Sequence, residues 1–243
     1  MNEIRLIIFD LGETLLHFEG DFFKVNEEGV RAMHAFLKSS GIALDFDRLL
    51  ETWTAERQKG FIRAEQTRRE VIADETLRDV LRQLGVEEID EDIIKKAVDI
   101  FFEPEIREYR PFPDAIETLK HLRDRGFQLA LISNATCDRL IKRMVEMFGF
   151  SEYLDPVLSS AGVGIRKPDP AIFMEALAAA GVEPPNAVMV GDSPYHDIKG
   201  AHLTGMRGVL VHFTDNIKGL EGELKPDFIA KELSDVIRYV EMA

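Results

Sequence analysis

The sequence predicts an α/β fold with a doubly wound, mostly parallel sheet and a helical segment inserted after its first strand. Three observations support this prediction: strands and helices alternate after Pro111, the stretch from Lys24 to Phe102 has only helical periodicity, and an apolar run ends on Asp10. Alternating strands and helices imply a parallel sheet covered on both faces. The 243 residues, 45% of them hydrophobic, suffice for one large domain or two smaller ones.

The apolar run Ile4–Phe9 is rich in β-branched residues and stops at Asp10 and Gly12. Such a run predicts a buried parallel strand with Asp10 at its carboxyl end. Ligands bind at that edge of open α/β sheets. An aspartate placed there can serve as a metal ligand, a nucleophile or both. The simpler alternative is a turn or helix-cap aspartate, which is common after strands.

The inserted segment is expected to form a small bundle of helices. Its apolar residues recur at helical spacing, and glycine or proline follows most of the expected helices. The expected helices contain Val30–Leu37, Phe46–Trp53, Val71–Leu84 and Ile93–Phe102, with ends at Ser39–Gly41, at Gly85 and before Pro104. The predicted domains are a helical cap over 18–107 and a core formed by 1–17 and 108–243.

The core segment after Pro111 is expected to contain alternating helices and strands. The expected helices are 114–125, 139–148, 171–180, 198–204 and a last one near 233–240. The expected strands are 127–132, 187–190 and 208–213, whereas 153–158 is a short apolar piece and the tail contains the segment 227–230. Most of these helices are followed by a glycine, which is the residue that most often ends a helix.

Charge and composition exclude several classes of function. A net charge of −14 repels nucleic acid and anionic membrane surfaces, so neither is an expected partner. No apolar run approaches the ~20 residues that span a membrane, and no secretory signal is expected. The single cysteine, Cys137, suits a reducing cytosol, so we expect a cytoplasmic protein.

Polar residues follow four of the expected strands and loops: Asp10, Ser133–Asn134, Lys167 and Asp192. Parallel strands place their carboxyl ends along one edge, so these residues can meet in one cleft. Two carboxylates can share Mg²⁺, which prefers a few oxygen ligands and keeps several waters. A hydroxyl and a lysine can hold a phosphate, and together with the metal they would neutralise a transferring phosphoryl group.

These residues resemble the motifs of the haloacid dehalogenase superfamily, whose members are mostly phosphatases that use an aspartate nucleophile. The segment 9–15 is similar to the first motif, Ser133–Asn134 to the second, Lys167–Pro168 to the third and 191–197 to the fourth. Each motif alone is weak, but four in the right order form a strong match. The resemblance runs over the whole chain and implies a Rossmann-like core, with the helical cap between the first and second motifs.

The resemblance also implies a role for each matching residue. Asp10 would form an aspartyl-phosphate, and Asp10, Asp192 and the Gly12 carbonyl would bind Mg²⁺. Asp197 would bind the metal through water or orient Lys167. The remaining residues would contact the phosphate: Ser133 and Asn134 would hold the phosphoryl group, and Lys167 would neutralise it.

The chain departs from the family pattern at Gly12, where an aspartate usually supplies acid–base catalysis worth ~10²–10⁴ in rate. One reading is a phosphatase for leaving groups that need little protonation. Another is replacement by Glu13, His17 or His196, although side chains adjacent on an extended backbone point to opposite sides. A third is a weak catalyst whose site serves binding or regulation.

We therefore expect a Mg²⁺-dependent phosphohydrolase acting on a small phosphorylated metabolite. The alternatives are a 2-haloacid dehalogenase-type hydrolase and a catalytically weak binding or regulatory protein. The dehalogenase branch also lacks the second aspartate, but it needs no metal. The acids Asp192 and Asp197 would repel each other in such a site, so they favour a metal-dependent phosphatase. The sequence does not indicate the oligomeric state or the physiological substrate.

One further feature is a basic cluster in the insert, formed by Arg57, Lys59, Arg63, Arg68 and Arg69. We interpret it as an exposed helix face with pairs at spacing i,i+4, in preference to a surface that binds an anionic substrate. Trp53 is expected in the core of the insert.

Overall fold

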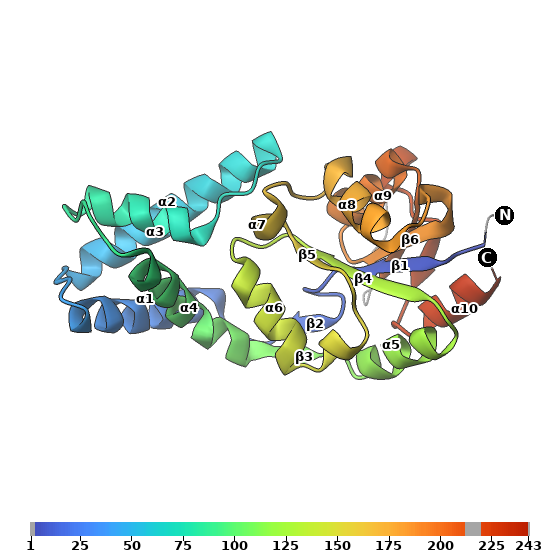
Figure 1. The fold of residues 1–243 in the computed structure, drawn as a ribbon, viewed down its shortest axis with the longest axis horizontal. Helices are drawn as coiled ribbons and strands as arrows, with labels where there is room; N and C mark the ends of the chain where they lie inside the picture. The colour runs from blue at the N-terminus through green and yellow to red at the C-terminus, as the bar shows by residue number, and fades with distance from the viewer. Residues whose placement is uncertain (1–2, 212–219, 243) are drawn as a thin grey trace. The chain divides into compact units, whose positions relative to one another are not determined.

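The computed structural model describes residues 3–211 and 220–242 (Figure 1). The chain forms two compact units, one made of residues 1–17 and 110–243 and the other of Phe18–Tyr109. The chain passes between them through two short strands, β2 (Leu16–Phe18) and β3 (Tyr109–Pro111), which pair as a two-stranded sheet. Within the described residues, no helix is long and apolar enough to span a bilayer.

The first unit contains a six-stranded sheet with the strand order β5-β4-β1-β6-β7-β8. Each strand pairs in parallel with its neighbours. Its strands are β1 (Leu6–Phe9), β4 (Gln128–Ser133), β5 (Val157–Ser159), β6 (Ala187–Gly191), β7 (Arg207–Val211) and β8 (Phe228–Ala230). After β1, the chain adds β4 and β5 on one side of β1 and then β6, β7 and β8 on the other side. Strand β1 is therefore at a topological switch point, where ligands bind in open α/β sheets.

Helices cover both faces of this sheet, which confirms the predicted doubly wound α/β fold. They are α5 (Ala115–Asp124), α6 (Asp138–Met147), α7 (Ser160–Val163), α8 (Pro170–Ala180), α9 (Lys199–Thr204) and α10 (Asp235–Met242). Figure 1 shows α8 and α9 on one side of the sheet and α5 and α10 on the other. On the α8 side, the alternate β1 residues Leu6 and Ile8 pack with Phe173 in one buried cluster.

The second unit consists of α1 (Phe22–Ser39), α2 (Phe46–Thr67), α3 (Ala73–Gln83) and α4 (Glu91–Glu108). The N-terminal amides of three helices are capped by aspartate side chains, those of Asp21, Asp45 and Asp90. Trp53 is fully buried in this unit and packs edge-on against Phe101 at 4.9 Å, as expected for a core residue.

The structure corrects three details of the predicted elements. Helix α4 continues through Pro104 to Glu108, whereas the sequence predicted an end before the proline. A proline inside a helix removes a hydrogen bond, but Pro104 and Ile106 are both buried, and this burial favours the continued helix. The second detail is β3 and the third is α7, neither of which was predicted. Residues 212 and 213 of the expected strand 208–213 lie outside the described residues.

Candidate active site

Three of the predicted site residues lie where neighbouring strands end. Asp10 directly follows β1, Asp192 directly follows β6, and Ser133 is the last residue of β4. Strand β1 lies between β4 and β6, with Phe9 in register with Leu131 on one side and Val190 on the other. Ser133 and Asp192 therefore flank Asp10 along the same edge of the sheet.

Lys167 joins this edge from the loop between α7 and α8. Its ammonium group donates to Asp10 Oδ1 at 2.7 Å, to Asp197 Oδ1 at 2.6 Å and to the Ile132 carbonyl at 2.9 Å. The residue is only 2% exposed. These three contacts match the three protons of an ammonium group, so the lysine is fixed in position and in charge.

Asp197 belongs to the single turn of π-helix, Pro194–Ile198, that leads from β6 into α9. Its side chain is completely buried, and its Oδ2 accepts a hydrogen bond of 3.0 Å from the Ser193 amide. A Cβ atom on Gly191 would lie 2.3 Å from the Asp197 carboxyl carbon. Glycine at position 191 therefore leaves the space that the buried carboxylate occupies.

Asn134 uses its side-chain amide to hold the main chain of Lys167. Its Nδ2 donates to the Lys167 carbonyl at 3.1 Å, and its Oδ1 accepts from the Lys167 amide at 2.9 Å. This pair of bonds ties the end of β4 to the loop that carries the lysine. In this structure Asn134 therefore positions Lys167, a function that its place in the sequence does not indicate.

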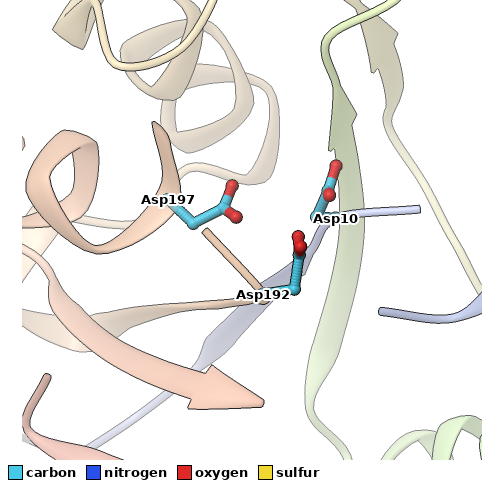
Figure 2. A group of neighbouring side chains, drawn as sticks. All are labelled: Asp10, Asp192 and Asp197. Carbon is cyan, nitrogen blue, oxygen red and sulfur yellow. The ribbon is translucent and has the colours of Figure 1, made fainter. Parts of the chain in front are cut away.

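The three aspartates bring their carboxylates together at this edge (Figure 2). One carboxylate oxygen from each of Asp10, Asp192 and Asp197 lies within 4.8 Å of the others. Burial, opposed by Lys167 and reinforced by Asp197, raises the pKa of Asp10 to about 6. Burial together with the charges of Asp10 and Asp197 raises the pKa of Asp192 to about 7. Burial disfavours the charge of Lys167, but the two neighbouring carboxylates outweigh it and raise the pKa of the lysine.

These donors fit a hard divalent cation. Oxygen ligands are the ones Mg²⁺ prefers, and three close carboxylates with one lysine leave an excess of negative charge for a cation to neutralise. Burial is the largest cause of the raised pKa values of Asp10 and Asp192, and repulsion between neighbouring carboxylates adds to it.

The loop after Asp10 turns sharply instead of continuing as a strand. The Glu13 amide donates to the Leu16 carbonyl at 2.6 Å, and the Leu16 amide donates to the Leu11 carbonyl at 2.8 Å. Glu13 has a left-handed backbone, with φ of 52°. Residues 12 and 13 are therefore not part of an extended strand, and the alternation of side chains that disfavoured Glu13 as a replacement does not hold in this loop.

The two histidines considered as proton donors have other contacts. The His17 ring lies 4.9 Å from the Phe112 ring. His196 Nδ1 lies 3.2 Å from Ser193 Oγ, and the His196 amide donates to the same oxygen at 3.1 Å. Ser193 and His196 thus close the first turn of the Pro194–Ile198 segment.

Two groups that shape the site were not predicted: the Ile132 carbonyl and the Ser193 amide. Both are main-chain groups, so residue type carries no signal for them. Their positions depend on how the strand end and the π-turn are folded.

The sequence matches the profile of the haloacid dehalogenase-like hydrolases over residues 4–205. Among curated proteins, it is 38% identical over 142 residues to a phosphoserine phosphatase from Thermus thermophilus, a match that covers 58% of this chain and 55% of that protein. It is 30% identical over 164 residues to a glyceraldehyde 3-phosphate phosphatase from Methanopyrus kandleri, covering 65% of this chain and 70% of that one.

Solved structures with the same fold cover the chain almost completely. A 2-haloacid dehalogenase from Pseudomonas syringae pv. Tomato DC3000 is 27% identical, with a TM-score of 0.70 over 98% of this chain and 99% of that one. The likeness to curated phosphatases is thus partial in length, since the match spans about half of the first of them, whereas the likeness in fold extends over the whole chain.

Proposed function

Because the chain belongs to the haloacid dehalogenase-like hydrolases, we propose that it is a metal-dependent phosphohydrolase acting on a small phosphorylated metabolite through an aspartyl-phosphate on Asp10. The observation that carries the proposal is the buried lysine between two aspartates. Lys167 bonds to Asp10 at 2.7 Å and to Asp197 at 2.6 Å, and Asp192 lies beside them. This arrangement provides a fixed carboxylate nucleophile with positive charge next to it.

In the proposed first step, a carboxylate oxygen of Asp10 forms a bond to phosphorus. The bond from phosphorus to the leaving oxygen breaks, and the electron pair departs with that oxygen. Lys167 holds Asp10 in position and offsets charge at the reacting centre. Water then attacks the phosphorus of the aspartyl-phosphate, which releases inorganic phosphate and restores the Asp10 carboxylate.

The metal site is proposed at Asp10, Asp192 and the Gly12 carbonyl, with Asp197 behind them. A Mg²⁺ ion bound there would supply charge stabilisation for the phosphoryl group. The Ser133 hydroxyl, at the end of β4 beside Asp10, is proposed to donate to a phosphoryl oxygen. Asn134 is proposed to act beside it through its hold on Lys167.

The curated relatives support phosphate chemistry, because both of those named above are phosphatases. We propose the helical unit, residues 18–109, as a cap that selects the substrate. We propose a cytoplasmic location because Cys137 is the only cysteine of the chain, which excludes an internal disulfide and suits a reducing compartment.

The test is release of p-nitrophenol from p-nitrophenyl phosphate, with Mg²⁺ and with EDTA. We expect turnover with Mg²⁺, loss with EDTA and a loss of at least ~10³-fold in Asp10→Asn, whose amide is not nucleophilic. Asp124→Asn is the matched control, because Asp124 forms only a surface pair with Lys120. Turnover that survives in Asp10→Asn would exclude Asp10 as the nucleophile.

The second candidate is hydrolysis of a 2-haloacid. It is favoured by the 27% identity and the shared fold with a 2-haloacid dehalogenase and by glycine at position 12. Halide release from 2-chloropropionate without metal would support it. The cluster of three carboxylates favours the phosphatase, because mutual repulsion among them is relieved by a cation.

A further inference from the structure

Gly12 differs from every other glycine in the described part of the chain. Each of the others either has a left-handed backbone or would place a Cβ atom within 3.2 Å of another atom. The conformation or the packing of the fold therefore accounts for glycine at those positions. At Gly12 the backbone is not left-handed, and a Cβ atom would meet nothing within 4 Å. The fold would accept a side chain at position 12.

The next residue has the opposite mismatch. Glu13 adopts a left-handed backbone with φ of 52°, which suits glycine and disfavours other L-residues by roughly 1–2 kcal/mol. The loop thus has glycine where the backbone does not need it and a side chain where the backbone would prefer glycine. Departures from local preference of this kind cluster at functional sites.

The open position lies two residues after the proposed nucleophile, beside a lysine whose protons are already committed. The three protons of Lys167 are engaged by Asp10, Asp197 and the Ile132 carbonyl. Asp197 is buried and holds Lys167, and Asp10 must be ionised to attack. The described contacts therefore leave the leaving oxygen without a proton from these groups, and Gly12 offers none.

We propose that Gly12 restricts this enzyme to phosphate substrates with an acidic leaving group, such as acyl phosphates, aryl phosphates and phosphoanhydrides. This inference rests on the proposed phosphohydrolase function. When the phosphorus–oxygen bond breaks, the electron pair stays on the leaving oxygen. A carboxylate, phenolate or phosphate can depart as an anion and exchange protons with solvent later, whereas an alkoxide cannot.

The test is kcat/KM for a series of phosphate monoesters with leaving groups from p-nitrophenol through phenol to alkyl alcohols, together with acetyl phosphate. The ratio kcat/KM includes steps only up to formation of the aspartyl-phosphate, so it reports departure of the leaving group. We expect the wild-type values to fall steeply as leaving-group pKa rises. Alkyl phosphates should lose at least the ~10²–10⁴ that a general acid provides.

The matched variants are Gly12→Asp, which introduces a carboxyl group, and Gly12→Asn, which introduces an amide of nearly the same shape that cannot act as an acid. We expect Gly12→Asp to raise the ratio of kcat/KM for alkyl phosphates to kcat/KM for p-nitrophenyl phosphate by ~10² or more, measured within the one variant. Gly12→Asn should keep the steep wild-type dependence. Melting temperatures near that of the wild type would show that both side chains fit at position 12.

Three results would overturn the inference. The first is a wild type that hydrolyses alkyl and aryl phosphates at similar rates. The second is a Gly12→Asp variant that behaves like Gly12→Asn. The third is a shallow wild-type dependence that becomes steep in Glu13→Gln, which would make Glu13 the acid. If the wild type turns over no phosphate ester, acetyl phosphate or p-nitrophenyl phosphate with Mg²⁺, the proposed function fails and this inference fails with it; the other three results leave the phosphatase standing.

Discussion

Each of the two units holds a cation near carboxylates, but Lys167 in the sheet unit is fully buried and Arg57 in the helical unit is half-buried. In the sheet unit, Lys167 bonds directly to Asp10 and Asp197 at 2.7 and 2.6 Å. In the helical unit, the Arg57 guanidinium lies 4.9 Å over the Phe101 ring and donates to Asn26 Oδ1 at 3.3 Å. The first cation is held by charge and the second mainly by aromatic faces and a neutral amide.

This difference also appears in the pKa values. Burial lowers the pKa of Arg57 and raises that of its neighbour Glu105, while their mutual attraction only partly offsets both effects. In the sheet unit the two carboxylates raise the pKa of Lys167 despite its burial. A compact charge cluster such as the one around Lys167 suits chemistry, because it fixes protons and charge at one point. The Arg57 arrangement suits packing of a helical core.

Replacing each cation by methionine is the strongest test of this contrast. Lys167→Met leaves Asp10 and Asp197 as neighbouring buried carboxylates, so we expect a loss of about 3–5 kcal/mol in the free energy of unfolding at neutral pH. Arg57→Met keeps the aromatic contacts and leaves only Glu105, which can take up a proton. We expect a loss of about 1 kcal/mol.

Urea unfolding can assign each loss to its unit. Trp53 is the only tryptophan of the chain and is buried in the helical unit, so its fluorescence follows that unit, while circular dichroism follows both. Lys167→Met should shift the dichroism transition and Arg57→Met the fluorescence transition. An equal or larger loss from Arg57→Met would show that the helical unit also depends on a direct charge pair.

The sequence predicted the sheet unit better than the helical unit. Asp10, Ser133, Lys167 and Asp192 were placed together because polar residues at the carboxyl ends of parallel strands must share an edge. In the helical unit, periodicity predicted the helices and the burial of Trp53, but a basic cluster was interpreted as one exposed face. Lys59, Arg63 and Arg69 are exposed as expected, whereas Arg57 is half-buried, because its long side chain reaches aromatic rings that sequence spacing does not reveal.

The pH dependence of stability provides a second test, of intermediate size. Folding raises the pKa of Asp10 from 3.8 to about 6 and that of Asp192 from 3.8 to about 7. At pH values between the unfolded and the folded pKa, the folded state holds protons that the unfolded state has released. In the absence of metal, the free energy of unfolding should therefore fall as pH rises from about 4 to about 7.

Added Mg²⁺ should reverse this loss, because it binds the ionised carboxylates. At 100 times its dissociation constant we expect about 2.7 kcal/mol of stabilisation. The melting temperature should therefore rise more with Mg²⁺ at pH 8 than at pH 5. Asp192→Asn should weaken both the pH dependence and the Mg²⁺ effect, whereas Asp124→Asn, at an exposed pair, should leave them unchanged. Equal stabilisation by Mg²⁺ at both pH values would argue against a metal at this cluster.

What the sequence could not provide is the main-chain geometry that fixes the site. Asn134 has a residue type compatible with phosphate contact, but its amide is used by the Lys167 main chain. Gly12 could be identified as unusual only by comparison with a family pattern. The structure adds a reason independent of any family, because it shows that the backbone and the surrounding space at position 12 do not require glycine.

The smallest effect is expected at the two non-glycine residues of the described chain that have a left-handed backbone, Glu13 in the sheet unit and Arg68 in the helical unit. Glu13→Gly should relieve an unfavourable backbone conformation and raise the free energy of unfolding by up to about 1 kcal/mol, since the relief exceeds the entropy cost of glycine. Arg68, at the end of α2 with φ of 59°, gains the same relief, but it also donates to the Glu65 carbonyl at 2.7 Å. Arg68→Gly loses that bond and should leave stability nearly unchanged. Destabilisation by Glu13→Gly in the same urea titration would mean that the contacts of the Glu13 side chain outweigh its backbone strain, and the loop would then keep glutamate for stability.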